Sequence, residues 1–253
     1  MGRFVAHEAP FAVSGRVVLV TGSTSGIGEA TARRFASAGD SVIFNSARSV
    51  EAGERLASTT PGSHYIQADI SSADDCARLV GEVLERYERL DVLVNNAGTT
   101  RMIPHQDLAA ATLAVWREIF EVNVFGTWSL SVAAMDALRA SRGTIVNVSS
   151  VAGVRPTGSS IPYAASKAAL NHMTALMAKV VGPEVRVNAV APGLVDTPWT
   201  ADWDVVRGFV TAVTPLKRSG TPEDIADVIV ALASTPYVTG QVVIVDGGLS
   251  LAN

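Results

Sequence analysis

The fold is decided by residues 17–28, which read Val17-Val18-Leu19-Val20-Thr21-Gly22-Ser23-Thr24-Ser25-Gly26-Ile27-Gly28. The β-branched run is typical of a buried strand, and a helical pattern begins at Gly26. Glycines between the two permit a tight turn and let the backbone approach a phosphate, while the helix N-terminus offers free N–H groups to that anion. No Gly-Lys-Ser/Thr follows, so a P-loop is excluded. The stretch predicts a strand–turn–helix unit that binds a pyrophosphate.

Strand and helix patterns alternate along the rest of the chain. The expected strands are Val17–Thr21, Ser41–Asn45, His64–Ala68, Val92–Asn95, Thr144–Val148, Arg186–Val190 and Val242–Val245. The expected helices are Gly26–Ser37, Val50–Ser58, Ala73–Arg86, Leu113–Arg139, Pro162–Val180 and Glu223–Ala233. Such alternation implies parallel pairing with right-handed crossovers. We therefore expect an α/β fold, a doubly wound seven-stranded parallel sheet with helices on both faces, in one domain of residues 1–253 with its core at 15–248.

The composition limits the classes of function. The chain has 253 residues, 48% of them hydrophobic, and a net charge of −4. The hydrophobic content excludes disorder, and the mild acidity argues against nucleic-acid binding. We find neither a targeting signal in Met1–Gly15 nor a run long enough to span a membrane. One cysteine, Cys76, and scattered histidines without metal-ligand spacing lead us to expect no disulfide, no metal and a cytoplasmic location.

Two stretches interrupt the regular alternation. Thr99–Ala111 follows the fourth strand, and Pro192–Gly220 follows the sixth. Both leave the carboxyl ends of strands, which is where open α/β sheets bind ligands. Because long connections of this kind are usually lids or binding loops, we expect residues 193–220 to form a lid over the substrate.

A candidate acid–base group lies in Tyr163-Ala164-Ala165-Ser166-Lys167. Residues i and i+4 of a helix share a face, with Cβ atoms roughly 5–6 Å apart. A lysine charge at ~5 Å, in an effective dielectric of ~20, favours the phenolate by about 3 kcal/mol, on the order of two pKa units. Ser150 follows the fifth strand and belongs to the same edge of the sheet, where its hydroxyl can donate to a substrate oxygen.

With these residues in hand, the chain resembles the short-chain dehydrogenase/reductase family from about Gly15 to Gly248. The resemblance is carried by Thr21–Gly28, Asn95-Asn96-Ala97-Gly98, Asn123, Asn147–Ser150, Tyr163-x-x-x-Lys167, Arg186-Val187-Asn188, Pro192-Gly193 and Asp246-Gly247-Gly248. It implies a Rossmann-type domain and an NAD(P)(H)-dependent oxidoreductase. It also implies a homotetramer, in which helices near 113–139 and 162–180 pack against their mates.

The resemblance assigns four catalytic residues by position. Tyr163 would donate or accept the proton, and Lys167 would lower its pKa and hold the nicotinamide ribose. Ser150 would orient the substrate carbonyl or hydroxyl. Asn123 would hold a water that links Lys167 to solvent.

The cofactor-binding residues implied by the resemblance follow the ends of several strands. They are Gly22, Ser23, Ser25, Gly26, Ile27 and Gly28 at the pyrophosphate, Asp69 and Ile70 at the adenine, Asn96, Ala97 and Gly98 at the adenosine ribose, and Pro192, Gly193, Val195 and Thr197 with Tyr163 and Lys167 at the nicotinamide.

The end of the second strand bears on the choice of cofactor. An NAD enzyme of this fold has a carboxylate there for the ribose 2′-hydroxyl, whereas an Arg suits a 2′-phosphate. No acidic residue occurs from Ser41 to Val50, and Ser46 and Arg48 are available to phosphate oxygens. We therefore predict NADP(H) in preference to NAD(H).

The substrate is less well defined by the sequence. The candidate lining residues are Ser150, Val151, Ile161, Tyr163, Leu194 and Trp199, with Arg101, Met102 and Trp203. The chain looks most like 3-oxoacyl-carrier-protein reductases, which suggests a carbonyl or secondary alcohol such as a 3-oxoacyl thioester; Arg101, Arg139 and Arg142 are candidates for a basic patch that an acyl carrier would need. A sugar or alcohol dehydrogenase, an isomerase, dehydratase or epimerase on the same fold, and a non-catalytic dinucleotide-binding regulator remain open.

Overall fold

A computed structural model describes residues 15–252 and shows one sheet of seven parallel strands. The strands are β1 (Val17–Val20), β2 (Ser41–Ser46), β3 (His64–Gln67), β4 (Val92–Asn95), β5 (Thr144–Val148), β6 (Arg186–Pro192) and β7 (Val242–Val245), in the spatial order β3-β2-β1-β4-β5-β6-β7. The predicted fold class is confirmed. The expectation that Met1–Gly15 carries no targeting signal concerns residues that lie, except for Gly15, outside the described part.

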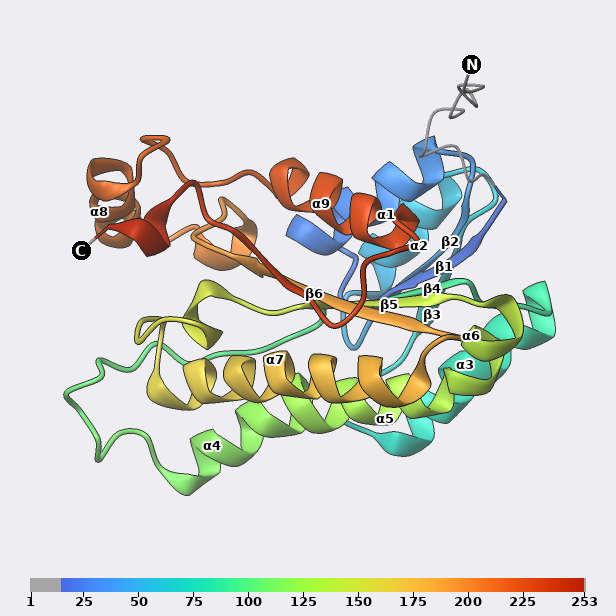
Figure 1. Ribbon diagram of the computed structural model, residues 1–253, viewed down its shortest axis with the longest axis horizontal. Coiled ribbons are helices and arrows are strands. Elements are labelled where there is room, and N and C mark those ends of the chain that lie inside the picture. The colour runs from blue at the N-terminus through green and yellow to red at the C-terminus, as the bar shows by residue number, and fades with distance from the viewer. Residues whose placement is uncertain (1–14, 253) are drawn as a thin grey trace, which may run out of the picture.

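Helices cover both faces of the sheet (Figure 1). Helices α1 (Gly26–Ser37), α2 (Val50–Ser58) and α9 (Pro222–Ser234) lie on one face, and α3 (Ala73–Tyr87), α4 (Leu113–Phe120), α5 (Thr127–Ala133), α6 (Met135–Ser141) and α7 (Ile161–Val181) lie on the other. Short helical turns are η1 (Glu121–Gly126), η2 (Val151–Gly153), η3 (Pro198–Thr200) and η4 (Leu249–Leu251). No helix within residues 15–252 combines the length and the apolar character needed to cross a bilayer.

Two hydrophobic cores follow from the alternation of side chains along the strands. Val17 and Leu19 of β1 enter the core beneath α3, α5 and α7, whereas Val18 and Val20 enter the core beneath α1 and α9. All four side chains are buried, as expected for a strand that has helices on both faces. The apolar run that predicted the first strand therefore fixes the sheet between two helical layers.

The helix predicted over Leu113–Arg139 is not continuous. The structure divides it into α4, the π-helical turn η1, α5 and α6. The wider turn η1 cannot be recognised from the spacing of apolar residues, because the residues before and after it keep the same helical pattern. The wider turn contains Asn123, whose side chain is buried at its centre.

The strand order creates a crevice at the carboxyl ends of β1 and β4. From β1 the chain proceeds outward to β2 and β3, then returns to β4 on the other side of β1. Such a topological switch point is where open α/β sheets bind ligands. The connections after β4 and β6 lie at this end (Figure 1), and the second contains a helix that the sequence analysis did not predict, α8 (Asp204–Val213).

Candidate active site

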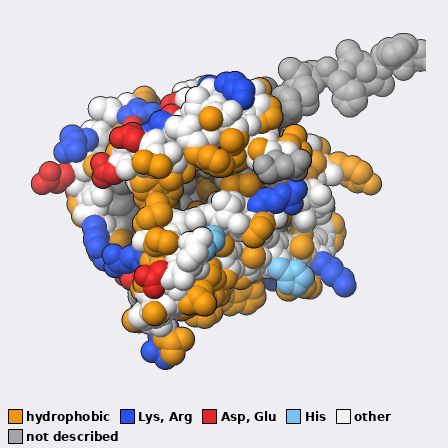
Figure 2. All heavy atoms as spheres, turned by 90° about the vertical axis from the view of Figure 1, so that its left-hand side faces the viewer, with side chains coloured by type: hydrophobic (Ala, Val, Ile, Leu, Met, Phe, Trp, Pro, Cys, Tyr) orange, Lys and Arg blue, Asp and Glu red, His pale blue; other side chains and the backbone are white. Residues whose placement is uncertain are grey.

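A cleft of about 1110 Å³ occupies the switch point. The segments that follow β1 to β6 line it, and so do α8 and the residues after β7. Figure 2 shows this end of the molecule, with hydrophobic side chains gathered around a hollow. The carboxyl ends of nearly all strands of the sheet therefore border this one cleft.

The glycine turn after β1 forms the floor of the cleft at the start of α1. Gly22 and Gly26 have φ values of +59° and +55°, a backbone conformation that side chains other than glycine rarely adopt. A Cβ on Gly28 would collide with the Gly22 carbonyl oxygen and the Asn96 amide. Ser25 makes no side-chain cap, so the first-turn N–H groups of α1 remain available to an anion.

The predicted pyrophosphate residues divide into two groups. Gly22, Ser25, Gly26 and Ile27 line the cleft, but Ser23 and Gly28 are buried behind it. The Ser23 hydroxyl accepts a hydrogen bond from the backbone N–H of Asn45 at 2.9 Å. These two residues therefore hold the turn against β2 and α1 instead of facing a ligand.

Asn96 joins the turn to β4. Its Nδ2 donates to the carbonyl oxygens of Thr21 at 2.8 Å and Gly22 at 3.0 Å. The Thr21 hydroxyl in turn accepts from the backbone N–H groups of Asn96 and Ala97, both at 3.0 Å. Asn96, Ala97 and Gly98 all line the cleft as predicted, and their polar groups make the turn rigid.

The far end of the cleft follows β2 and β3. Ser46, Arg48, Asp69 and Ile70 line it, and Asn45 and Ala47, which the sequence analysis did not single out, line it as well. The Asp69 carboxylate accepts from the backbone N–H and hydroxyl of Ser71 at 3.0 and 2.7 Å. Arg48 is exposed and faces the same end of the cleft.

The segment after β6 closes the cleft opposite the glycine turn. Pro192, Gly193, Val195 and Thr197 line it as predicted. A Cβ on Gly26 would lie 3.1 Å from the Thr197 methyl carbon, so the glycine turn and this segment are in close contact. The groove between them fits an extended dinucleotide, because it joins a positive helix end to a polar far end.

The candidate catalytic side chains meet near the same segment. Ser160 caps α7 by accepting from the backbone N–H of Tyr163, which fixes the first turn of this helix. One turn later, Lys167 is buried and donates from Nζ to the Val148 carbonyl oxygen at 2.8 Å. Its Nζ lies 5.8 Å from the centre of the Tyr163 ring. Ser150, Tyr163 and Lys167 all line the cleft.

The pKa of the phenol shifts in the direction opposite to the sequence expectation. Burial raises the pKa of Tyr163 above its ordinary value of 10, with an opposing effect from the hydrogen bond to Ser150. Burial also lowers the pKa of Lys167 to about 8. Loss of water on burial penalises the charged form of each group.

Asn123 is buried and does not line the cleft. Its Oδ1 accepts from the backbone N–H of Thr99 at 2.8 Å, and its Nδ2 donates to the Thr99 carbonyl at 3.0 Å and to the Ser166 hydroxyl at 3.0 Å. The side chain thus fastens the segment after β4 to α7, next to Lys167. Both hydrogens of its Nδ2 are engaged in these contacts, whereas Oδ1, which can accept two hydrogen bonds, accepts one of them from Thr99.

Of the residues predicted to contact the substrate, some line the cleft and others do not. Met102, Val151, Leu194, Trp199 and Trp203 line the cleft. Ile161 and Arg101 do not appear on its surface. The guanidinium of Arg101 instead forms two-pronged contacts with the Glu118 carboxylate, the shortest 2.8 Å.

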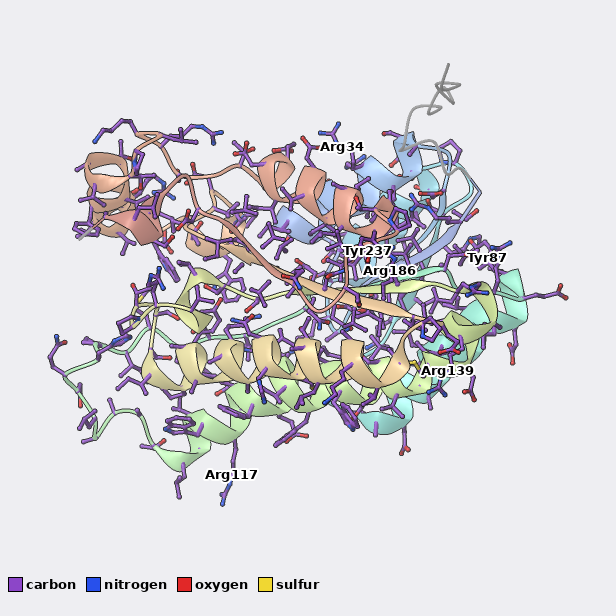
Figure 3. The ribbon with its side chains drawn as sticks, viewed as in Figure 1. Arg34, Tyr87, Arg117, Arg139, Arg186 and Tyr237 are labelled. Carbon is purple, nitrogen blue, oxygen red and sulfur yellow. The ribbon has the colours of Figure 1, made fainter. Side chains whose placement is uncertain are left out.

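The basic patch suggested for an acyl carrier does not form around the cleft. Arg139 lies on α6, at the end of the molecule away from α8 (Figure 3). Arg101 lies on the connection after β4 and Arg142 directly follows α6, and neither lines the cleft. The three arginines therefore form no basic patch at the cleft.

Several lining residues were missed in the sequence analysis. They are Val206, Phe209, Val210 and Val213 of α8, and Leu249, Ser250 and Ala252 after β7. The helical spacing of the apolar residues in 203–213 was the signal available for α8. Nothing local in the sequence indicates that the chain end after β7 returns to the cleft.

The comparisons with known proteins agree with this geometry. A family model described as enoyl-(acyl carrier protein) reductase matches residues 22–250. The chain is 55% identical to a Streptomyces violaceoruber protein named as ketoacyl reductase 2 of the granaticin polyketide synthase, over 97% of this chain and 98% of the relative. It is 39% identical to the 3-oxoacyl-[acyl-carrier-protein] reductase FabG of Thermotoga maritima, over 94% and 98%.

A solved structure from Burkholderia xenovorans, described as a short-chain dehydrogenase/reductase, superposes with a TM-score of 0.89 at 38% identity. The match covers 95% of this chain and all of that one. The fold, the cleft and these relatives together establish that the chain belongs to the short-chain dehydrogenase/reductase family and is an oxidoreductase that uses a nicotinamide cofactor.

Proposed function

We propose that the enzyme uses NADPH to reduce the ketone of a 3-oxoacyl thioester or a chemically related carbonyl compound. The observation that carries this proposal is the convergence of Ser150, Tyr163 and Lys167 at the cleft, beside the segment after β6. The names of the two relatives, ketoacyl reductase and 3-oxoacyl reductase, support a ketone as the group that reacts.

The chain's own residues supply the proton and the orientation. The Tyr163 hydroxyl transfers its proton to the substrate oxygen, and the Ser150 hydroxyl donates a hydrogen bond to the same atom. Lys167, anchored at the Val148 carbonyl, holds the nicotinamide ribose and stabilises the phenolate that is left. The cofactor, when bound, supplies the hydride to the carbonyl carbon. The phenolate then regains a proton from solvent, and Asn123, next to Lys167, supports that route.

The preference for NADPH rests on the end of β2. Arg48 is exposed at the far end of the cleft, and no carboxylate occurs from Ser41 to Val50. A 2′-phosphate would find the Arg48 guanidinium and the first N–H groups after Ser46 in this region. The remaining contacts of the cofactor would come from the cleft-lining residues predicted from the sequence.

Replacing Tyr163 by Phe tests the proposed reaction. We expect NADPH affinity within about twofold of the unmodified enzyme and kcat reduced by about 10²–10⁴-fold, because only the proton donor is removed. Tyr237→Phe is a matched control: this tyrosine is 99% exposed and lies away from the cleft (Figure 3). A Tyr163→Phe enzyme that keeps full activity on acyl thioester and ketone substrates would refute the assignment.

We also propose one domain whose 193–220 segment is the substrate lid, assembled as a homotetramer. Large apolar side chains on the α4–α7 layer are exposed, including Leu113, Phe125, Trp128, Leu176 and Val180. Apolar exposure of this kind is typical of contacts between subunits. Light scattering of the purified protein should give four times the mass of the 26.4 kDa chain, and a stable monomer at micromolar concentration would contradict the assembly.

A further inference from the structure

Three aromatic side chains form part of the substrate half of the cleft. Trp199 of η3 and Trp203, at the start of α8, line it together with Phe209 of α8. Trp199 remains 49% exposed and Phe209 62% exposed, although both face the cleft. Aromatic surface left in contact with water in this position favours an apolar ligand that covers it.

The indole nearest the chemistry is well placed to meet a ring. The Trp199 ring lies edge-on to the Tyr163 ring, with centres 6.4 Å apart and planes at 82°. The indole and the proposed proton donor are therefore neighbours on the surface of the cleft. Aromatic side chains interact favourably with rings in offset or edge-to-face geometry, beyond the contribution of buried area alone.

Helix α8 extends the same surface. Residues 203, 206, 209–210 and 213 recur at helical spacing, and all of them line the cleft. The other side of the helix bears Asp204 and Val205, which lie outside the cleft lining. The helix therefore presents a continuous apolar face towards Tyr163 and a separate face towards solvent.

Two further apolar side chains line the same cleft, and one of them follows a turn that packs beside the end of α8. Met102, 54% exposed, comes from the connection after β4, and Leu249 comes from the turn after β7. A thioether adapts its shape and makes favourable contacts with aromatic rings.

We propose that the carbonyl compound accepted by this enzyme carries a fused-ring or aromatic body, which packs against the aromatic side chains of Trp199, Trp203 and Phe209, with Met102 and Leu249 completing the apolar lining. The inference rests on the proposed reduction at Tyr163, and it narrows the substrate class of that site. The linear acyl thioesters named in the relatives' activities are then accepted less well by this chain.

The test measures binding, so it does not depend on turnover. Calorimetry of the NADPH-loaded enzyme compares 2-naphthol with decan-2-ol, since both have ten carbon atoms and one hydroxyl but differ in shape. We expect 2-naphthol to bind about tenfold more tightly, because the ring contacts are available to it alone. Equal binding, or tighter binding of the linear alcohol, overturns the proposal.

Four variants locate the effect. Trp199→Ala and Phe209→Ala should each weaken 2-naphthol binding by about five- to tenfold and change decan-2-ol binding by less than about twofold. Val205→Ala is the matched control on α8, because Val205 is 88% exposed and lies outside the cleft. Trp199→Leu keeps an apolar side chain and removes the aromatic ring. If it binds 2-naphthol as well as the unmodified enzyme, the preference for rings is wrong.

The outcome is separable from that of the proposed reaction. A fully active Tyr163→Phe enzyme would remove the catalytic assignment and leave the calorimetric ratio unchanged. A ratio near one would remove the fused-ring inference and leave the loss of activity in Tyr163→Phe unchanged.

Discussion

The two halves of the cleft are built in different ways. In the dinucleotide half, backbone groups and short polar side chains bond to one another, as Asn96 does to Thr21 and Gly22. In the substrate half, large apolar side chains such as Trp199 and Phe209 face the cleft and remain about half exposed. The dinucleotide half is held in place by its internal hydrogen bonds, whereas the substrate half leaves apolar surface exposed that a bound ligand would cover.

This difference explains how tolerant each half should be of change. A substitution in the packed glycine turn of the dinucleotide half displaces backbone, so it should affect both folding and cofactor binding. A substitution in the substrate half changes only which molecules fit. The following predictions test that contrast.

The largest effect is expected for Gly28→Ala. The new methyl group would overlap the Gly22 carbonyl oxygen and lie within 2.9 Å of the Ser23 Cα atom, both of which are backbone atoms. Overpacking of this kind costs about 1–3 kcal/mol, and each kcal/mol lowers Tm by about 2–4 °C in a chain of this size. We expect Tm to fall by several degrees and NADPH binding to weaken, as measured by thermal unfolding with and without cofactor.

Gly81→Ala is the control for that experiment. Gly81 lies in α3, and a Cβ there would meet no atom within 4 Å. Since alanine favours helix more than glycine by up to about 1 kcal/mol, Tm should stay constant or rise. If Gly28→Ala behaves in the same way as Gly81→Ala, the dinucleotide half is less tightly packed than we infer.

A smaller effect is expected for Arg48→Ala. An exposed charge on a phosphate contributes about 1 kcal/mol or less, so kcat/KM for NADPH should fall about fivefold while kcat/KM for NADH changes little. Arg55→Ala is the matched control, because this arginine on α2 is 71% exposed and lies outside the cleft. An enzyme that prefers NADH before any substitution would show that the end of β2 binds a ribose hydroxyl by another route.

The same contrast explains which residues of the cleft could be predicted from the sequence. The dinucleotide half is encoded locally, in the run 17–28 and in the residues that directly follow β3, β4 and β6, so most of the predicted cofactor residues line it, although Asn45 and Ala47 were missed. The exceptions, Ser23 and Gly28, face inward because the turn bonds to β2 and Asn96. The spacing of residues along the chain does not show whether a residue faces the cleft or the protein interior.

The substrate half is assembled from distant parts, which explains the missed residues. Leu249 meets Trp199 and Met102 in one cleft only because the chain after β7 returns to it. The pKa of Tyr163 was misjudged for a related reason. The distance to Lys167 follows from helical geometry, but the loss of water around both groups depends on the whole fold.

The smallest effect is expected for Arg207→Gln, which loosens α8 from the residues that directly follow β6. Arg207 on α8 donates to the Asp196 carboxylate at 2.8 Å and to the Thr200 carbonyl at 2.9 Å, and Ser219 donates to the other oxygen of Asp196. The Arg207 guanidinium, with Ser219, holds the pKa of Asp196 below its ordinary value of 3.8. A lowered carboxyl pKa adds stability that is present above that value and is lost as pH falls below it, so the contact is complete between pH 6 and 8.

Because the Arg207–Asp196 pair is partly exposed, it contributes about 1 kcal/mol or less. We expect KM for the carbonyl substrate to rise about two- to threefold, with KM for NADPH nearly constant and both changes independent of pH from 6 to 8. Arg33→Gln is the control, since it removes a comparable exposed pair with Glu29 on α1, away from the lid. An equal rise in both KM values would mean that α8 and the residues that directly follow β6 move as one body. The two halves of the cleft would then be less independent than their different packing indicates.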